Sequence, residues 1–326
     1  FYLFRINTII FLFYINKKYV RQGDIQPRQL FTQEDRTVDV SECLRDVEKN
    51  LERMAAILRL KSHPDIAIGP NCNKPYPCPL QPLCWKHVPE DSVFNLTNVR
   101  QTKAFEWFSN GYRRLSDLSS QVVHLTPKQN IQVEATKSGR PFVDSKAIRE
   151  FLALLQYPLC FLDFETFFTG IPLVDNCRPY QQIPFQYSLR IVEREGGKAR
   201  HHSFLADGAH DPRKEFLDGL AALLGARGSV VAFNATFEKQ RLRECCDFYP
   251  KFKPWLKSLE PRIVDLLPPF RSFRYYHPDQ MGSASLKEVL PALTGEDYEK
   301  LEIADGNHAS LEFLRVSGTS KVINRQ

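Results

Sequence analysis

The sequence predicts an α/β fold in which a mixed sheet flanked by helices follows a mostly helical region. Three observations lead to this prediction. Helical patterns dominate up to about residue 156, and strand-like runs alternate with helical patterns after it. A proline-rich loop within the helical region carries regularly spaced cysteines, which predicts a metal-binding loop. With 326 residues the chain is long enough for more than one hydrophobic core.

The composition is that of a soluble globular protein, with 43% hydrophobic and 25% charged residues. The net charge of +6 fits a polyanionic partner without requiring one. The eight cysteines are a poor disulfide framework for a chain of this length, so we expect a reducing, cytoplasmic compartment. The apolar run from Ile9 to Ile15 is far shorter than the roughly 20 residues that span a bilayer. We expect a buried strand there, and neither a membrane span nor a signal peptide.

Helical spacing of apolar residues predicts a helix over about 40–61, with Asp39 as its N-cap. Shorter helices are expected over 102–109 and 127–136, and another should begin after Asp144. The stretch GYRRLSDL between two of them faintly resembles a helix-hairpin-helix, whose loop amides bind phosphates. The alternative for this stretch is a helical linker.

The second half alternates strands and helices. The runs FLDFE, IPFQYSLRIVE and ARHHSFLA read as three strands joined by hairpin-like connections. They are followed by helix DPRKEFLDGLAALLG, strand SVVAFN, helix TFEKQRLREC, strand RIVDLL, and helices SASLKEVLPAL and DGNHASLEFLRV. This order predicts a mixed sheet with helices packed against it.

The run YPLCFLDFET places Asp163 and Glu165 two residues apart on a predicted strand. Side chains at such spacing point to the same face, so both carboxylates project into one site. Carboxylates so close repel each other unless a cation or a proton compensates them. Mg²⁺ and Mn²⁺ are the usual compensating ions.

Two later segments carry further candidates. Asn234 ends the strand SVVAF, and Glu238 follows four residues later on the next predicted helix. On the last predicted helix His308 and Glu312 again stand four residues apart, with the histidine as a candidate general base. The alternative for this late pair is an exposed helix face.

The order of these motifs resembles the DEDD exonucleases. The resemblance implies a ribonuclease H-like fold and a two-metal Mg²⁺ or Mn²⁺ site that hydrolyses phosphodiesters in the 3′–5′ direction. Asp163 and Glu165 match the first acidic motif. Glu238 stands where the family has Asp, whereas His308 and Glu312 match by spacing only and the usual final Asp is absent. Asp265, by the same resemblance, is structural and not a ligand.

The cysteine loop is the candidate cofactor site of the first half. Cys72, Cys78 and Cys84 form C-x5-C-x5-C within a loop stiffened by five prolines. Thiolates select zinc or iron-sulfur clusters, and the lack of a CxxC pair favours a cluster. The fourth ligand is Cys43, His87 or a residue upstream of Phe1. The alternative is three buried cysteines without a ligand.

This loop resembles that of RecB-like PD-(D/E)XK nucleases carrying a 4Fe-4S cluster. No D…ExK pattern occurs here, so the resemblance implies a C-terminal remnant that cannot cut alone. The two halves together resemble the domain of unknown function 2779 family over most of residues 15–310, whereas the last two dozen residues diverge. The motifs are NKKYVRQGDI, YPLCFLDFET, RPYQQIPFQYSLR, DPRKEFL, FNATFEKQRL, RIVDLLPPF and SASLKEVLPAL, with the cysteine loop. The implied divisions are 1–90 as the remnant, 91–156 as a helical linker and 157–326 as the exonuclease-type domain.

Amides and aromatic rings near the carboxylates are candidate nucleic-acid contacts. Tyr180 and Gln182 are candidates to line a strand groove, Phe167 to wedge a terminal nucleotide, and Asn234 to bind beside the acids. The bland alternative is a proline-rich loop whose aromatic rings pack into the core.

The leading hypothesis is therefore a cytoplasmic metal-dependent exonuclease that acts on single-stranded DNA or RNA. A second hypothesis is a non-catalytic nucleic-acid-binding protein with a decayed acidic site and a structural iron-sulfur cluster. A third is a redox or structural iron-sulfur protein unrelated to nucleic acids.

Overall fold

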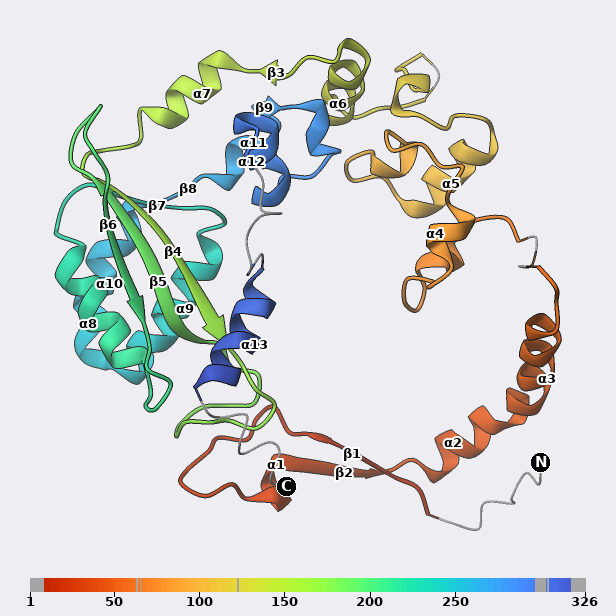
Figure 1. The fold of residues 1–326 in the computed structure, drawn as a ribbon, viewed down its shortest axis with the longest axis horizontal. Helices are drawn as coiled ribbons and strands as arrows, with labels where there is room; N and C mark the ends of the chain where they lie inside the picture. Colours follow the sequence, from red (N-terminus) through yellow and green to blue (C-terminus); the bar gives the residue numbers. More distant parts are fainter. Residues whose placement is uncertain are drawn as a thin grey trace. The chain divides into compact units, whose positions relative to one another are not determined.

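The computed structural model describes residues 9–317 except 63, 65, 122, 297–302 and 304 (Figure 1). It divides into two compact units. The first unit comprises Phe1–Ala67 and Phe168–Gln181, and the second comprises Ile68–Phe167 and Gln182–Gln326. These units cross the boundaries expected from the sequence, and the three-part division stays a prediction.

Helices and strands alternate after the first third of the chain, as predicted. The strands are β1 (Phe11–Ile15), β2 (Phe31–Asp35), β3 (Phe142–Val143), β4 (Leu159–Phe167), β5 (Ile183–Val192), β6 (Arg200–Leu205), β7 (Ser229–Ala232), β8 (Ile263–Asp265) and β9 (Tyr275–Tyr276). The α-helices are α1 (Pro27–Leu30), α2 (Thr37–Cys43), α3 (Val47–Leu58), α4 (Gln81–Cys84), α5 (Gln101–Ser109), α6 (Pro127–Ser138), α7 (Ser145–Leu152), α8 (Arg213–Leu223), α9 (Thr236–Phe248), α10 (Lys253–Leu259), α11 (Leu267–Arg271), α12 (Leu286–Thr294) and α13 (Gly306–Val316).

The second unit is built on a five-stranded mixed sheet of order β6-β5-β4-β7-β8. Strands β4, β5 and β6 are antiparallel neighbours, whereas β7 runs parallel to β4 and β8 parallel to β7. A β-bulge interrupts the β4–β5 register between Glu165 and Thr166. The predicted α/β architecture with a mixed sheet and flanking helices is confirmed.

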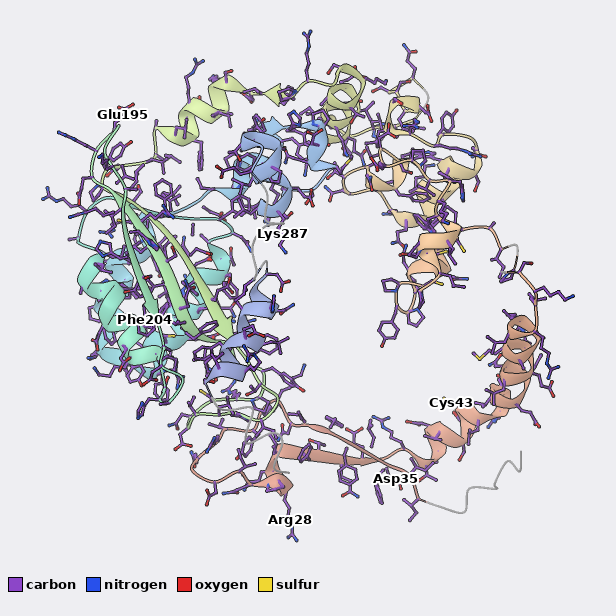
Figure 2. All side chains as sticks on the ribbon, viewed as in Figure 1. Arg28, Asp35, Cys43, Glu195, Phe204 and Lys287 are labelled. Atoms are coloured by element: carbon purple, nitrogen blue, oxygen red, sulfur yellow. The ribbon has the colours of Figure 1, made fainter. Side chains whose placement is uncertain are left out.

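One face of this sheet forms the main hydrophobic core. Leu162 and Phe164 of β4 are buried in a cluster with Phe216 of α8, Leu242 of α9 and Leu256 of α10. Figure 1 shows α8, α9 and α10 gathered on one side of the sheet. Phe204 of β6, labelled in Figure 2, joins this core. The helices predicted from amphipathic patterns thus cover the apolar face of the strands.

The last helix, α13, packs near the end of β4. Phe313 stacks on Phe185 of β5, with ring centroids 4.1 Å apart, and its ring lies 5.4 Å from that of Phe167. Phe313 is 8% exposed and Phe167 4% exposed. Burial of these three aromatic rings fixes α13 against the sheet.

A smaller hydrophobic cluster lies under the helices that precede β4. Trp107 and Phe108 of α5 pack with Leu118 and Val133. The expected helix after Asp144 is α7, and the Asp144 carboxylate caps it by accepting a hydrogen bond from Ala147 N at 3.0 Å.

In the GYRRLSDL stretch the amides of Arg113 and Arg114 donate to the side chain of Asp117, at 2.9 and 2.8 Å. Leu115, in the same stretch, is buried in the cluster of α5 and α6. These two amides are therefore already engaged by an acidic side chain, and the choice between a helix-hairpin-helix and a helical linker stays a prediction.

The first unit departs from two expectations. Strand β1 pairs with β2, but it is exposed and not buried, with Phe13 60% and Leu12 48% exposed. A two-stranded hairpin has two faces and little core, so its apolar side chains stay accessible. The helix expected over 40–61 is divided into α2 and α3 by a 3-10 turn at Leu44–Asp46, and it begins at Thr37 without a cap from Asp39.

In the part of the chain that the structure describes, no helix has the length and apolarity needed to cross a membrane.

Candidate active site

Strand β4 presents two carboxylates on one face of the sheet. Asp163 pairs across the strands with Ser188, and Glu165 pairs with Gln186. Phe164 lies between them and is buried on the opposite face, 3% exposed, against Phe216. The predicted alternation is confirmed, and both carboxylates leave the same face of β4.

Glu238 lies in the first turn of α9, directly after β7. Since β7 is the parallel neighbour of β4, this helix starts beside the carboxylate strand. Glu238 is 5% exposed, and its Oε2 atom has no hydrogen-bond partner in the part of the chain that the structure describes. Burial, followed by the negative charges of Asp163 and Asp265, raises the pKa of Glu238 to about 7.

Asp265 performs a structural role, in keeping with its resemblance-based expectation. Its Oδ1 accepts hydrogen bonds from the backbone amides of Asn234, at 2.8 Å, and Leu267, at 2.9 Å. Asn234 itself is exposed and has a φ of +67°, a left-handed conformation that asparagine tolerates better than most residues. Asp265 therefore holds the turn that leads into α9.

The N-terminus of α13 brings a fourth carboxylate to the site. Asp305 is its N-cap and accepts a hydrogen bond from His308 N at 2.9 Å. Its negative charge contributes to raising the pKa of Glu165. A Cβ atom added to Gly306 would lie 2.7 Å from Glu165 Oε2, so the helix start directly abuts this carboxylate. Sequence reasoning missed Asp305, although an Asp directly before a helical pattern is a recognisable N-cap signal.

The two residues that the sequence singled out on α13 take different positions. Glu312 lines a pocket with Asp163 and Glu165. It also forms an ion pair with Arg315 at 2.7 Å, and this hydrogen bond is the main cause of its lowered pKa. His308 is exposed and is not part of the pocket wall, although its charge contributes to lowering the pKa of Glu312.

The pocket beside the carboxylates has a volume of about 540 Å³. Its polar lining comes from Asp163, Glu165, Gln186, Asp207, Glu312 and Ser317. Its apolar lining comes from Phe185, Leu205, Ala206, Ile303, Ala309, Phe313 and Val316. The described residues that line it thus form an acidic wall and an apolar wall, and none of them is basic.

The pKa values of the two β4 carboxylates of this site are raised. Burial raises the pKa of Asp163. Burial also raises the pKa of Glu165, and the negative charges of Asp163 and then of Asp305 raise it further. Asp163 is nevertheless solvent-accessible, although neighbouring atoms keep part of the surrounding water away from its carboxylate. Among the described residues, no Lys or Arg forms an ion pair with Asp163, Glu165 or Glu238. A cation or bound protons must supply the compensation.

Within the described ranges, no three His, Cys, Asp or Glu side chains form a ready-made metal-binding group. The cysteine loop contains Cys72 in a 3-10 turn and Cys84 at the end of α4, with Cys78 N donating to Cys72 O at 2.8 Å. The three thiols are half-buried, and Cys43 lies in the first unit. The side chain of His87 lies beside Phe108, with ring centroids 5.8 Å apart. The iron-sulfur cluster stays a prediction.

The remaining candidates are engaged within the protein to different degrees. Gln182 accepts a hydrogen bond from Arg241 Nη1 at 2.8 Å. Phe167 is buried against Phe313, so its ring is not presented as a wedge for a nucleotide. Tyr180 belongs to the first unit, is 45% exposed, and has the Lys17 ammonium 5.7 Å from its ring centroid. The amide that does reach the carboxylate pocket is that of Gln186.

Comparisons with known proteins agree with the family resemblance. Residues 160–285 match the model of the family described as domain of unknown function (DUF2779), a segment that runs from β4 to the loop before α12. The uncharacterized protein MG366 of Mycoplasma genitalium is 25% identical over 207 residues, which is 56% of this chain and 30% of that relative. This chain therefore covers less than a third of the relative's length. No solved structure matches.

Proposed function

We propose that the second unit is a metal-dependent nuclease domain that hydrolyses phosphodiester bonds of single-stranded DNA or RNA. The observation that carries the proposal is the mutual repulsion of neighbouring carboxylates, Asp163 with Glu165 and Glu238 and Asp305 with Glu165, while no described Lys or Arg pairs with Asp163, Glu165 or Glu238. Among the described residues Glu238 Oε2 is buried and has no hydrogen-bond donor, which suits an oxygen that binds a cation.

The sheet topology supports the ribonuclease H-like resemblance. Three antiparallel strands are followed by two parallel ones in the order β6-β5-β4-β7-β8, with the first acidic motif on the central strand β4. The second acid opens the helix after the neighbouring parallel strand, and the third acidic segment is the last helix. This is the order of motifs that the DEDD resemblance implies.

The donor set fits a hard divalent ion. Asp163, Glu165 and Glu238 would hold Mg²⁺ or Mn²⁺, with Asp305 as an additional carboxylate, because hard cations prefer oxygen ligands. When bound, such ions polarise a phosphoryl oxygen and make water a better nucleophile at neutral pH. Gln186 would orient a polar group of the substrate, and the apolar wall at Phe185 and Leu205 would exclude water from it.

His308 lies outside the pocket wall. It could therefore act as general base only if its side chain moved toward the pocket or the site closed around a substrate. Glu312 is inside the wall, but Arg315 already pairs with it. The 3′–5′ polarity remains part of the proposal and rests on the family resemblance.

The test is cleavage of end-labelled single-stranded DNA and RNA with Mn²⁺ or Mg²⁺. We expect Asp163→Ala to abolish cleavage, because it removes one of the carboxylates that would hold the metal. Asp247→Ala, at an exposed position paired with Lys253, serves as the control and should cleave normally. Cleavage by Asp163→Ala at the wild-type rate would contradict the assignment.

Two observations favour a second candidate, a nucleic-acid-binding domain that no longer cleaves. Glu238 replaces the expected Asp, and Glu312 is engaged with Arg315. Salt-dependent binding without cleavage in either metal would support this candidate.

The 4Fe-4S cluster is proposed on Cys72, Cys78 and Cys84 with a ligand from elsewhere. Protein purified without oxygen should contain iron and sulfide, and serine at all three positions should remove them. If the purified protein contained zinc and neither iron nor sulfide, the three cysteines would instead be assigned to a zinc site.

A further inference from the structure

The carboxylate face of the sheet continues past the acidic pair as an open surface. The strand registers align Asp163, Ser188 and Ser203 in one row across β4, β5 and β6. The neighbouring row, toward the start of β4, consists of Phe161, Arg190 and His201. Rows whose side chains lie on the same face of the sheet are two residues apart along each strand, a distance of about 7 Å. We call Phe161, Arg190 and His201 the basic-aromatic row.

The basic-aromatic row is accessible in this unit. Phe161 is 39% exposed, and Arg190 and His201 are also exposed. The helices α8, α9 and α10 pack on the opposite face of the sheet, through residues such as Leu189 and Ile191 that alternate with Arg190. The row is therefore not part of the hydrophobic core, and its exposed phenylalanine has no structural partner among the described aromatic rings.

The charged member of the row is available to a ligand. Among the described residues, Arg190 makes no side-chain hydrogen bond and no ion pair, whereas Arg200 nearby is paired with Glu193. An unpaired guanidinium on an open face is a ready donor to phosphate oxygens. Its register position places it one row from Asp163.

A hydrogen bond connects the basic-aromatic row with the acidic one. The side chain of Ser188, opposite Asp163, lies 3.0 Å from His201 Nε2. This contact holds the imidazole over the sheet between the two rows. The face thus presents carboxylates, a hydroxyl, an imidazole, a guanidinium and a flat ring in a continuous strip.

We propose that the basic-aromatic row binds the single-stranded polynucleotide next to its reacting phosphodiester. The inference rests on the proposed function for the acids, and it adds the path of the strand and its binding residues. Arg190 would bind a backbone phosphate, and Phe161 would stack on a base adjacent to the one held at the acids. Charge supports this occupant, since a polyanion complements the arginine while bound cations complement the acids.

A duplex fits this strip less well than a single strand. The bases of a duplex are stacked on each other, so none offers its face to Phe161, whereas unpaired bases stack on exposed aromatic rings. The pattern also differs from a protein-docking patch, because the one exposed ring is flanked by an arginine and a histidine and not by further apolar groups.

The experiment measures binding of fluorescein-labelled oligothymidylate and oligouridylate to the full chain by anisotropy in EDTA, where turnover is prevented. Arg190→Glu should lower affinity about tenfold or more, whereas Lys257→Glu, the same charge change on an exposed residue of α10, should change it little. Arg190→Ala should reduce the slope of log affinity against log salt by about 0.7. Phe161→Ala should lower affinity roughly fivefold to a hundredfold. Circular dichroism checks that each variant is folded.

The outcomes separate this inference from the proposed function. If the wild type cleaves but Arg190→Glu and Phe161→Ala bind the labelled oligonucleotides with the same affinity as Lys257→Glu, the strand path is overturned while the nuclease assignment stands. If nothing cleaves but the row variants weaken binding, the strand path stands and the catalytic assignment falls. If the wild type neither binds nor cleaves, both are overturned. A fluorescein-labelled duplex measured in the same way should bind more weakly, and equal affinity for it would contradict the stacking role of Phe161.

Discussion

At the scale of single residues, the site is defined by carboxylates that the fold brings together at an electrostatic cost. Glu238 shows this most clearly, because it is almost fully buried, its Oε2 lacks a partner, and Asp163 lies close enough to disfavour its charge. Such an arrangement is unfavourable for a protein alone and favourable for one that binds a cation.

The first prediction concerns Glu238→Gln in metal-free protein. The pKa of Glu238 in the folded protein is about 7, above its ordinary value of 4.5, so between these two pH values the folded protein holds a proton that the unfolded chain has released. The stability contributed by that proton is present below about pH 4.5 and is lost as the pH rises through about 7. In EDTA the free energy of unfolding of the glutamine variant should equal that of the wild type near pH 4 and should be higher by about 3 kcal/mol near pH 8.

The measurement is urea unfolding across this pH range, with and without Mn²⁺. Added metal should stabilise the wild type more than the variant and narrow the gap at high pH. If the difference in unfolding free energy between the variant and the wild type were the same at every pH, burial would not perturb the pKa of Glu238.

The second prediction distinguishes Asp305 from Glu312 as the fourth acid. Asp305→Asn keeps the N-cap of α13, because asparagine caps as well as aspartate, yet it removes the charge beside Glu165. We expect nuclease activity to fall at least about tenfold while the melting temperature changes little. Glu312→Gln, which disrupts the pair with Arg315, should have the smaller effect on activity. The reverse ranking would assign the role to Glu312.

Much of the acidic site was predictable from spacing. Asp163 and Glu165 share a face because strand side chains alternate, and Glu238 follows because a helix begins after the neighbouring strand. Asp305 was not predicted, because its proximity to Glu165 depends on how a distant helix docks. The burial of Phe167 was missed for the same reason, since it depends on Phe313.

At the scale of elements, α13 is the part that completes the site. Its aromatic contact with β5 holds it in place, and its first residues abut Glu165. The long periodic patterns of α5, α6, α8, α9 and α13 were predicted well, because each has an apolar face. Short elements such as β2, α10 and β9 were missed, since they owe their conformation to tertiary partners rather than to local pattern.

The third prediction uses Gly306, where α13 begins. Alanine there would place a methyl group 2.7 Å from Glu165 Oε2, so either the carboxylate or the helix must move. Because this oxygen is the end of a flexible side chain and can shift, we expect Gly306→Ala to lower the affinity for Mn²⁺ by displacing the carboxylate and to change thermal stability little. Gly225→Ala is the matched control, because no atom lies within 4 Å of its added methyl group. Isothermal titration with Mn²⁺ and thermal unfolding would measure both effects, and identical behaviour of the two variants would contradict the close approach.

At the scale of the whole molecule, the two units differ in how much they bury. In the first unit the buried apolar side chains among the described residues are Tyr19, Leu30, Pro172, Cys177 and Pro179, whereas the second unit contains the large clusters around β4 and α5. The strand β1 was expected from its apolar sequence, but its pairing with β2 and its exposure were not, because a local pattern does not reveal what pairs with a strand or covers it.

The fourth prediction follows from this difference. Amides of β1 and β2 should exchange with deuterium much faster than those of β4, β5 and β7, because few apolar contacts oppose opening of the hairpin. Hydrogen-exchange mass spectrometry at several protein concentrations would measure it. Equal protection that persists on dilution would mean that the hairpin is more stable than its burial suggests.

The bulge after Glu165 affects how more distant sequences should be compared with this one. It adds one residue to β5 relative to β4, because Glu165 pairs with Gln186 and Thr166 pairs with Pro184, which leaves Phe185 without a partner on β4. In a relative whose β5 is regular there, an alignment without a gap would place residues of opposite facing beneath Ile183 and Pro184. Alignments should therefore treat IP and QYSLRIV as separate blocks of β5, with a one-residue gap allowed at Phe185.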